Sequence, residues 1–203
     1  MFICFEGIAG SGKTTQTKLL ADYLKNIKSK DIFVSAVYER GRRKAISGFM
    51  NLLGIKADQN AVMFLFQALH AIQHHEVNEA LMSGKIVIAD RWRYYFFSHH
   101  LQQNPFNGDT KLMNKLDLLA HRTLEPDIYF LLKVPPLIAY ERYLKREHAI
   151  SGGGLDLMDG KYFKSVSGYY EQLAHDKGWN VIDGMQSQDK ISKEIHCIID
   201  KKL

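Results

Sequence analysis

The stretch Gly7-Ile8-Ala9-Gly10-Ser11-Gly12-Lys13-Thr14 decides the fold of this chain, because it matches the phosphate-binding pattern G-x-x-x-x-G-K-[ST]. Residues 2–5 before it form a short apolar run with the composition of a strand. After it, apolar residues recur at helical spacing as far as Leu24. A strand, a glycine-rich turn and a helix in this order direct backbone N–H groups and the positive end of the helix dipole at phosphate oxygens.

The residue types in this loop indicate which ligands it takes. A lysine at position 13 reaches the β- and γ-phosphates of a nucleoside triphosphate, and a hydroxyl at position 14 ligates Mg²⁺. We therefore expect a nucleoside triphosphate as phosphoryl donor, with Mg²⁺ as the metal. The residues expected to contact the donor are Gly7, Gly10, Ser11, Gly12, Lys13, Thr14 and Thr15.

Length and composition predict an ordinary globular domain. The chain has 203 residues, of which 46% are hydrophobic and 24% charged, so one domain over residues 1–203 can bury a full core. No apolar run approaches the ~18 residues that a membrane helix needs, so no membrane partner is expected. The two cysteines, Cys4 and Cys197, have no metal-binding spacing, which favours a reduced, cytoplasmic protein.

The formal net charge of +5 leaves two kinds of anionic partner to consider. One is a nucleic acid, and the other is a small anionic molecule. The densest basic cluster, Arg40, Arg42, Arg43 and Lys44, is short and has no interleaved aromatic residues. We therefore expect small anions as ligands and no nucleic acid.

Predicted strands and helices alternate along the chain, which is typical of a parallel sheet covered by helices on both faces. The fold class expected is α/β, a three-layer P-loop NTPase fold with a five-stranded parallel sheet and a short lid at about residues 146–160. The predicted strands cover residues 2–5, 32–38, 86–89, 127–132 and 179–183. The predicted helices cover residues 14–24, 60–82, 136–148 and 160–177, with a last one from about residue 190.

Asp90 and Arg91 follow the buried strand over residues 86–89. Open α/β sheets bind their ligands at this carboxyl end of the strands. A carboxylate there holds Mg²⁺ or its waters, and an arginine beside it clamps a phosphate with two hydrogen bonds. We expect Asp90 at the metal, and Asp90 and Arg91 together with Lys13 in catalysis. The alternative for Asp90 and Arg91 is a surface ion pair.

Arg142 and Arg146 are four residues apart, so they share one face of a predicted helix. The glycine-rich segment at residues 151–154 follows directly and is suited to closing as a lid. Phosphoryl transfer needs cations that neutralise charge once water is excluded, so both arginines are candidate catalytic residues. The alternative is a solvated basic face paired with Glu141 or Glu147.

The chain resembles the thymidylate kinases over nearly its whole length and in the same order. The Asp-Arg-aromatic and Pro-Asp signatures are more specific than the phosphate loop, which many NTPases share. The segments that carry the resemblance are Phe5-Glu6-Gly7, Gly10 to Gln16, Val87-Ile88-Ala89-Asp90-Arg91-Trp92, Glu125-Pro126-Asp127, Val134-Pro135-Pro136, Ala139-Tyr140-Glu141-Arg142, and Phe163, Val166 and Tyr169. This resemblance implies a homodimer that phosphorylates thymidine monophosphate from ATP.

The resemblance also implies an acceptor site, formed by Glu39 and Arg40, by Phe66 stacking on the base, by His70 at its edge and by Arg91. Here the chain departs from the family. His70 stands where the family has an arginine that hydrogen-bonds thymine, and Ala9 stands where an acidic residue is usual. A neutral histidine donates or accepts only one hydrogen bond at the base edge, so we expect relaxed or altered base choice.

Three classes of function are compatible with these patterns. The first is a nucleoside monophosphate kinase, most simply one that converts dTMP to dTDP. The second is a P-loop kinase of a different small acceptor, either another nucleotide or a nucleoside. The third is a non-catalytic protein that kept the fold, but such a protein is expected to have lost Lys13, Thr14 or Asp90, and all three are present.

Overall fold

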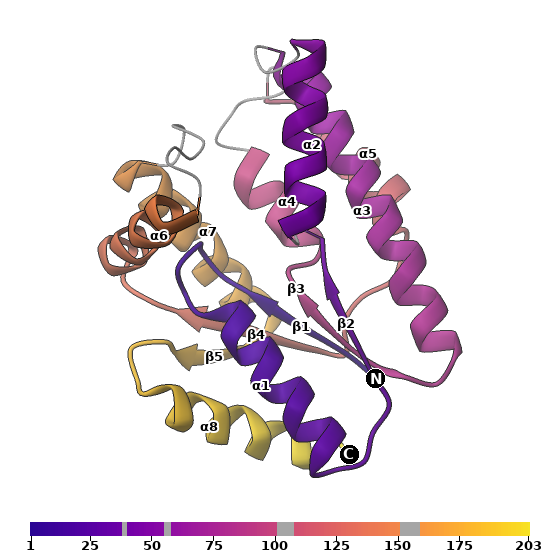
Figure 1. Cartoon of the computed structure of the whole chain (residues 1–203), viewed down its shortest axis with the longest axis vertical. Coiled ribbons are helices and arrows are strands. Elements are labelled where there is room, and N and C mark those ends of the chain that lie inside the picture. The colour runs from indigo at the N-terminus through magenta and orange to yellow at the C-terminus, as the bar shows by residue number, and fades with distance from the viewer. Residues whose placement is uncertain (38–39, 55–57, 101–107, 151–158) are drawn as a thin grey trace.

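Five parallel strands form the centre of the computed structural model, which describes residues 1–37, 40–54, 58–100, 108–150 and 159–203. The sheet has the order β2-β3-β1-β4-β5, and each neighbouring pair is parallel (Figure 1). Strand β1 lies between β3 and β4, and the connections that leave β1 and β3 run to opposite sides of the sheet, which is where open α/β sheets bind ligands. The strands are β1 (Phe2–Glu6), β2 (Ile32–Ala36), β3 (Ile86–Asp90), β4 (Ile128–Lys133) and β5 (Asn180–Asp183).

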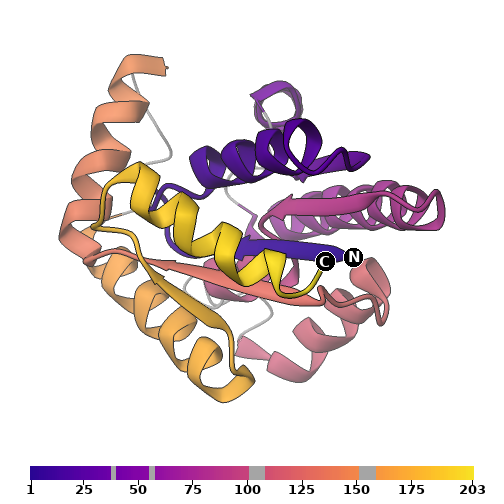
Figure 2. The same ribbon diagram turned by 90° about the horizontal axis from the view of Figure 1, so that it is seen from below.

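Helices cover both faces of this sheet, which confirms the expected three-layer α/β class. Helices α1 and α8 pack side by side on one face, and α3, α4 and α7 lie on the other (Figure 1). Seen from below, both chain termini lie close together (Figure 2). The helices are α1 (Lys13–Asn26), α2 (Arg40–Leu53), α3 (Gln59–Met82), α4 (Arg93–His100), α5 (Thr110–His121), α6 (Pro136–Ile150), α7 (Gly160–Lys177) and α8 (Gln188–Asp200).

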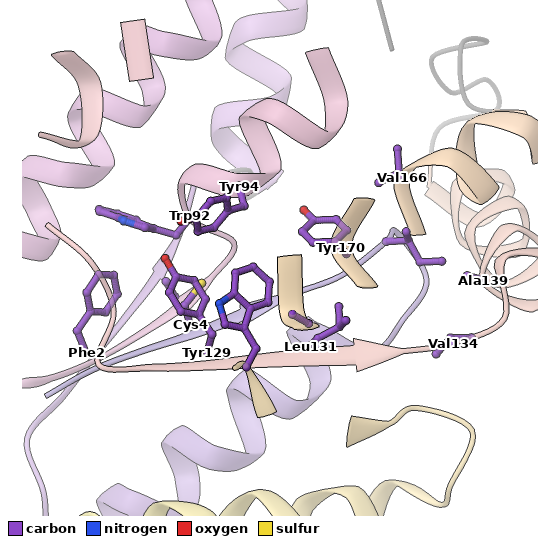
Figure 3. Packing of buried hydrophobic residues seen from close by; sticks show 14 of the residues in the cluster. Phe2, Cys4, Trp92, Tyr94, Tyr129, Leu131, Val134, Ala139, Val166 and Tyr170 are labelled. Carbon is purple, nitrogen blue, oxygen red and sulfur yellow. The ribbon is translucent and has the colours of Figure 1, made fainter. Parts of the chain in front are cut away.

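Alternating side chains of β1 supply the two halves of the core. Ile3 and Phe5 pack with Leu20 and Leu24 of α1, and with apolar residues of α8. Phe2 and Cys4 face the opposite layer, where they join buried aromatic side chains. Figure 3 shows this second cluster, in which Trp92, Tyr94, Tyr129 and Tyr170 gather beside β4. Because both faces of β1 are buried, the loop that follows it starts from a fixed position.

The structure corrects the sequence prediction in two places and leaves a third untested. Helices α2, α4 and α5 were not expected, and the basic residues from Arg40 onward begin α2 rather than an irregular strand exit. The second strand ends at Ala36, short of the predicted boundary at residue 38. Residues 151–158, most of the predicted lid, lie outside the described part of the chain, so the lid remains a prediction.

Candidate active site

The phosphate loop joins the end of β1 to the start of α1, as its sequence predicts. Gly7, Gly10 and Gly12 all have positive φ angles, of 134°, 79° and 99°. Gly10 is also required for close packing, because a Cβ atom there would lie 2.3 Å from the backbone oxygen of Ala139. Glycine adopts these positive φ angles without strain, whereas other residues do not. The loop can therefore curve around a ligand and still pack against α6.

Lys13 is the first residue of α1 and is 3% exposed. Its Nζ donates hydrogen bonds to the backbone oxygen of Ile8 at 2.7 Å and to Ser11 Oγ at 3.2 Å, across the loop. Burial and, to a smaller extent, the charge of Arg91 lower the pKa of Lys13 to about 7. A bound polyphosphate would favour the charged ammonium, so the loop is prepared to hold an anion.

Thr14 and Asp90 come together from α1 and the end of β3. The Thr14 hydroxyl donates a hydrogen bond of 2.5 Å to Asp90 Oδ2. The other oxygen, Oδ1, is buried and accepts no hydrogen bond from any residue in the described ranges. A hydroxyl beside a carboxylate oxygen with spare capacity is a donor set that Mg²⁺ prefers, so these two residues fit the expected metal.

Arg91 occupies an unusual backbone position directly after β3. Its φ is 75°, in the left-handed region that residues other than glycine rarely adopt. Its N–H donates to the Phe5 carbonyl at 3.0 Å, and its own carbonyl accepts from Gln73 Nε2 at 3.1 Å. Hydrogen bonds on both sides of the residue hold this strained conformation, which is common at functional sites.

The guanidinium of Arg91 lies between a carboxylate and an aromatic ring. Its Nη1 is 3.7 Å from Asp90 Oδ1, and its central carbon is 4.6 Å from the ring centre of Tyr95. Burial opposes the charge, but Asp90 and the surrounding acidic groups raise the pKa of Arg91 above its ordinary value. A permanent cation, half-buried beside the phosphate loop, is suited to binding a second phosphate group.

Glu6 is a central residue that the sequence analysis quoted in a motif but did not place in the site. It is fully buried, and its Oε1 accepts a hydrogen bond of 3.0 Å from the backbone N–H of Trp92. Its Oε2 accepts from the Tyr170 hydroxyl of α7, also at 3.0 Å. Glu6 therefore connects the strand before the phosphate loop with the Asp90-Arg91 corner and with α7.

The charge state of Glu6 is set by its surroundings. Burial raises the pKa of Glu6 from 4.5 to about 7, although the Trp92 and Tyr170 hydrogen bonds and the charges of Arg91 and Lys13 favour the carboxylate. The Tyr170 hydroxyl also accepts a hydrogen bond of 3.1 Å from Ser98 in α4. This buried network fixes three elements around the site, and its partners are far apart in sequence.

Arg142 and Arg146 both lie on α6, near the phosphate loop. Arg142 donates a hydrogen bond of 3.5 Å to the Gly184 carbonyl in the turn after β5. The Arg146 guanidinium is 5.5 Å from the ring centre of Tyr143, and its charge is among those that lower the pKa of Lys13. Arg146 is therefore electrostatically coupled to the loop, whereas the contact shown for Arg142 is with the neighbouring turn.

The structure describes only some of the acceptor-site residues that the resemblance implies. Glu39 lies outside the described residues, and Arg40 begins α2 with its side chain undescribed. Phe66 is half-buried on α3. His70 is fully buried, with its ring 4.8 Å from that of His121 and 6.2 Å from that of Phe96. The contacts shown for His70 are thus with neighbouring rings, and its role at a base edge remains a prediction.

The sheet order, the phosphate loop and the Asp90-Arg91 corner together define a P-loop phosphotransferase. The sequence model of the thymidylate kinase family matches residues 5–195. The chain belongs to the thymidylate kinase family, which confirms the resemblance stated from its motifs.

Individual relatives agree with this assignment over the full length of the chain. The thymidylate kinase of Thermosipho melanesiensis is 32% identical, and the match covers 100% of this chain and 99% of the relative. The thymidylate kinase of a Sulfurihydrogenibium species is also 32% identical, covering 98% and 94%. That of Plasmodium falciparum is 29% identical, covering 96% and 87%.

Proposed function

We propose that this protein transfers the γ-phosphoryl group of ATP to dTMP, giving ADP and dTDP. The observation that carries the proposal is the meeting of Lys13, Thr14, Asp90 and Arg91 at the carboxyl ends of β1 and β3, in a chain of the thymidylate kinase family. This arrangement offers one cationic loop for the donor and one buried arginine for the acceptor.

The transfer is a direct displacement. An oxygen of the dTMP phosphate attacks the γ-phosphorus of ATP, and the bond to the oxygen that bridges the β- and γ-phosphates breaks as ADP leaves. Lys13 and the loop N–H groups hold the donor phosphates, and Arg91 holds the acceptor phosphate in line with them. No covalent enzyme intermediate is needed, because positioning and charge neutralisation supply the catalysis.

Thr14 and Asp90 would hold the Mg²⁺ ion of MgATP. The ion supplies neutralisation of phosphate charge and orientation of the phosphoryl group. The observation that supports this assignment is the buried Asp90 Oδ1, which accepts no hydrogen bond from the described residues. Arg146, and Arg142 beside it, are assigned to the donor side, where they would neutralise charge when the segment after α6 closes.

The acceptor base is assigned to the part of α3 that includes Phe66 and His70. Arg91 lies at the inner end of this region, because Gln73 of α3 holds its carbonyl. Glu39 and Arg40 are assigned to the same nucleotide from the other side. A kinase of another small acceptor is the second candidate, and the buried position of His70 favours it, since this side chain replaces the family's edge-reading arginine.

We also propose a cytoplasmic homodimer. Cys4 and Cys197 are both free thiols, which suits a reducing compartment. No helix in the described ranges is long and apolar enough to span a membrane. Helices α2, α3 and α5 expose large apolar side chains, among them Leu52, Ile72 and Leu119, which suits an interface between two copies of the chain.

The test is a screen of deoxy- and ribonucleoside monophosphates with ATP and Mg²⁺, with ADP release as the measure. We expect dTMP to be phosphorylated by the natural protein, and Lys13→Ala to lose at least ~10²-fold in kcat. Lys18→Ala, at an exposed position on the same helix, serves as the control. Activity on another acceptor with none on dTMP would move the assignment to the second candidate.

A further inference from the structure

The face of α3 that is turned toward the core carries more polar groups than a helix needs for packing. It presents Met63, Gln67, His70, Gln73 and His74, all less than 9% exposed, at helical spacing. Farther along, Val77 and Ala80 continue the same face as ordinary core residues. The polar part of the face therefore spans residues 67–74 and includes Gln73, which contacts Arg91.

Gln67 has the least satisfied side chain on this face. It is 8% exposed, and neither Oε1 nor Nε2 has a hydrogen-bond partner among the described residues. Proteins rarely leave a buried carboxamide without partners, because the lost hydrogen bonds with water are not replaced. Such a group requires an explanation, and a missing ligand is one that agrees with its position.

Other unsatisfied atoms form a path from Gln67 to the active site. Gln73 Oε1, Arg91 Nε and Asp90 Oδ1 are also buried without a hydrogen bond in the described part of the chain, although Asp90 Oδ1 lies 3.7 Å from Arg91 Nη1. Gln73 touches Arg91 directly through its hydrogen bond to the Arg91 carbonyl. Buried polar atoms that make no hydrogen bond therefore lie both at the expected phosphate position and farther along α3.

The distance along the helix fits a nucleotide. Gln67 precedes Gln73 by six residues, which places it about 9 Å farther along the helix axis at 1.5 Å per residue. Helix α3 rises beyond the carboxyl ends of β2 and β3 at this point, beside α2 and α4 (Figure 1). A nucleotide whose phosphate meets Arg91 has its sugar and base to place along this same direction.

We infer that Gln67 is a specificity-determining residue that reads the hydrogen-bonding edge of the acceptor base. Its carboxamide presents an acceptor beside a donor, which matches the adjacent N3–H donor and O4 acceptor of thymine. Oε1 accepts from N3–H, and Nε2 donates to O4. This inference rests on the proposed phosphorylation of dTMP, and it gives the edge-reading role to Gln67 in place of the buried His70.

The experiment compares Gln67→Met with the natural protein, because methionine has a similar length and no amide. We expect KM for dTMP to rise at least ~10-fold, since a base-reading hydrogen-bond pair is lost, while KM for ATP changes less than twofold. The melting temperature should stay the same or rise, because an unsatisfied buried amide has been removed. Gln172→Met, at an exposed glutamine of α7, is the matched control.

A modified nucleotide provides the second measurement. In dTMP methylated at N3, the donor that Gln67 Oε1 accepts is absent, so the natural protein should use it at least ~100-fold less well than dTMP. In Gln67→Met the two nucleotides should differ by less than about tenfold, because both changes remove the same interaction. An equal ratio in both proteins, or equal changes in KM for dTMP and ATP, overturns the inference. Lack of any activity on dTMP in the natural protein would instead contradict the proposed function.

Discussion

Arg91 combines a strained backbone with a buried charge, and both properties are explained if it grips the acceptor phosphate. Its left-handed φ of 75° directs the residue away from the line of β3, and Phe5 and Gln73 fix its N–H and carbonyl. The cost of this conformation is on the order of 1–3 kcal/mol, which the surrounding hydrogen bonds offset. The charge is then held rigidly beside the phosphate loop, where a flexible arginine would lose rotamer freedom on binding.

Arg91→Lys should weaken binding of the acceptor dTMP more than binding of the donor ATP. Lysine keeps the charge but cannot form two parallel hydrogen bonds to one phosphate, and Arg91→Ala removes the clamp entirely. Loss of a charged clamp costs about 1.5–3 kcal/mol, so KM for dTMP should rise roughly 10- to 150-fold in Arg91→Ala. Arg122→Ala is a suitable control, since Arg122 also has a positive φ but is exposed. A rise in the KM for ATP alone would show that Arg91 serves the donor.

Glu6 should make stability depend on pH. Its pKa is raised from 4.5 to about 7 in the folded protein, so the folded state binds this proton more tightly than the unfolded state. The resulting stabilisation is complete below pH 4.5 and is lost as pH rises through 7, by up to about 3 kcal/mol. Glu6→Gln lacks this group, so its stability relative to the natural protein should increase between pH 5 and pH 7.5 in urea unfolding. Parallel pH profiles for the two proteins would contradict the assignment.

The sequence predicts the site residues that lie in contiguous motifs and misses those brought together by the fold. Lys13 and Thr14 open the helix after β1, Asp90 ends β3 and Arg91 follows it, so the carboxyl edge of a parallel sheet collects these residues. Tyr170 is 164 positions from Glu6, and nothing in its local sequence marks it as a partner. Contacts of this range depend on how α7 packs, which a local pattern does not contain.

At the scale of elements, the regular part of the fold follows from the hydrophobic pattern and from the capping and glycine residues that begin and end each element. Helix α3 begins after Asp58, which caps it by accepting from the Ala61 N–H, and ends before Gly84, whose φ is 78°. Of the three unexpected helices, α5 begins with a similar signal, because Asp109 caps it by accepting from the Leu112 N–H. Helix α2 opens with basic residues and contains Gly41 and Gly48, which are poor helix formers, so propensity gave no signal for it.

The contact between the phosphate loop and α6 should be sensitive to a single methyl group. In Gly10→Ala the added Cβ meets the Ala139 backbone oxygen at 2.3 Å, and φ is +79°. We expect a loss of more than ~1 kcal/mol, a melting temperature lower by more than about 3 °C, and reduced turnover as the loop shifts. Gly168→Ala on α7 has open space around it and should be stabilising by about 0.5–1 kcal/mol. Equal effects of the two substitutions on thermal unfolding would exclude the steric argument.

At the scale of the whole molecule, apolar side chains fill the core on both faces of the sheet, but several large apolar side chains of α2, α3 and α5 are exposed to solvent. On α3, Phe64 and Ile72 are about half exposed, whereas Gln67 and His70 are buried. Leu52 of α2 and Leu119 of α5 are 81% and 76% exposed. Isolated apolar residues are common on surfaces, but a group of this size over three helices is typical of an interaction surface.

If this surface joins two copies of the chain, a charge at its centre should separate them. We expect the natural protein to sediment with twice its 23.3 kDa at micromolar concentration, and Ile72→Lys to sediment as a 23.3 kDa monomer. In the dimer, a lysine at this position would lose its water without gaining a fixed partner, which costs free energy. Because a two-fold interface contains the same residue from both copies, the dimer would carry this cost twice. Leu137→Lys, at an exposed position on α6, should leave the mass unchanged. A natural protein that stays at 23.3 kDa at every concentration would show instead that the active site works within a single chain.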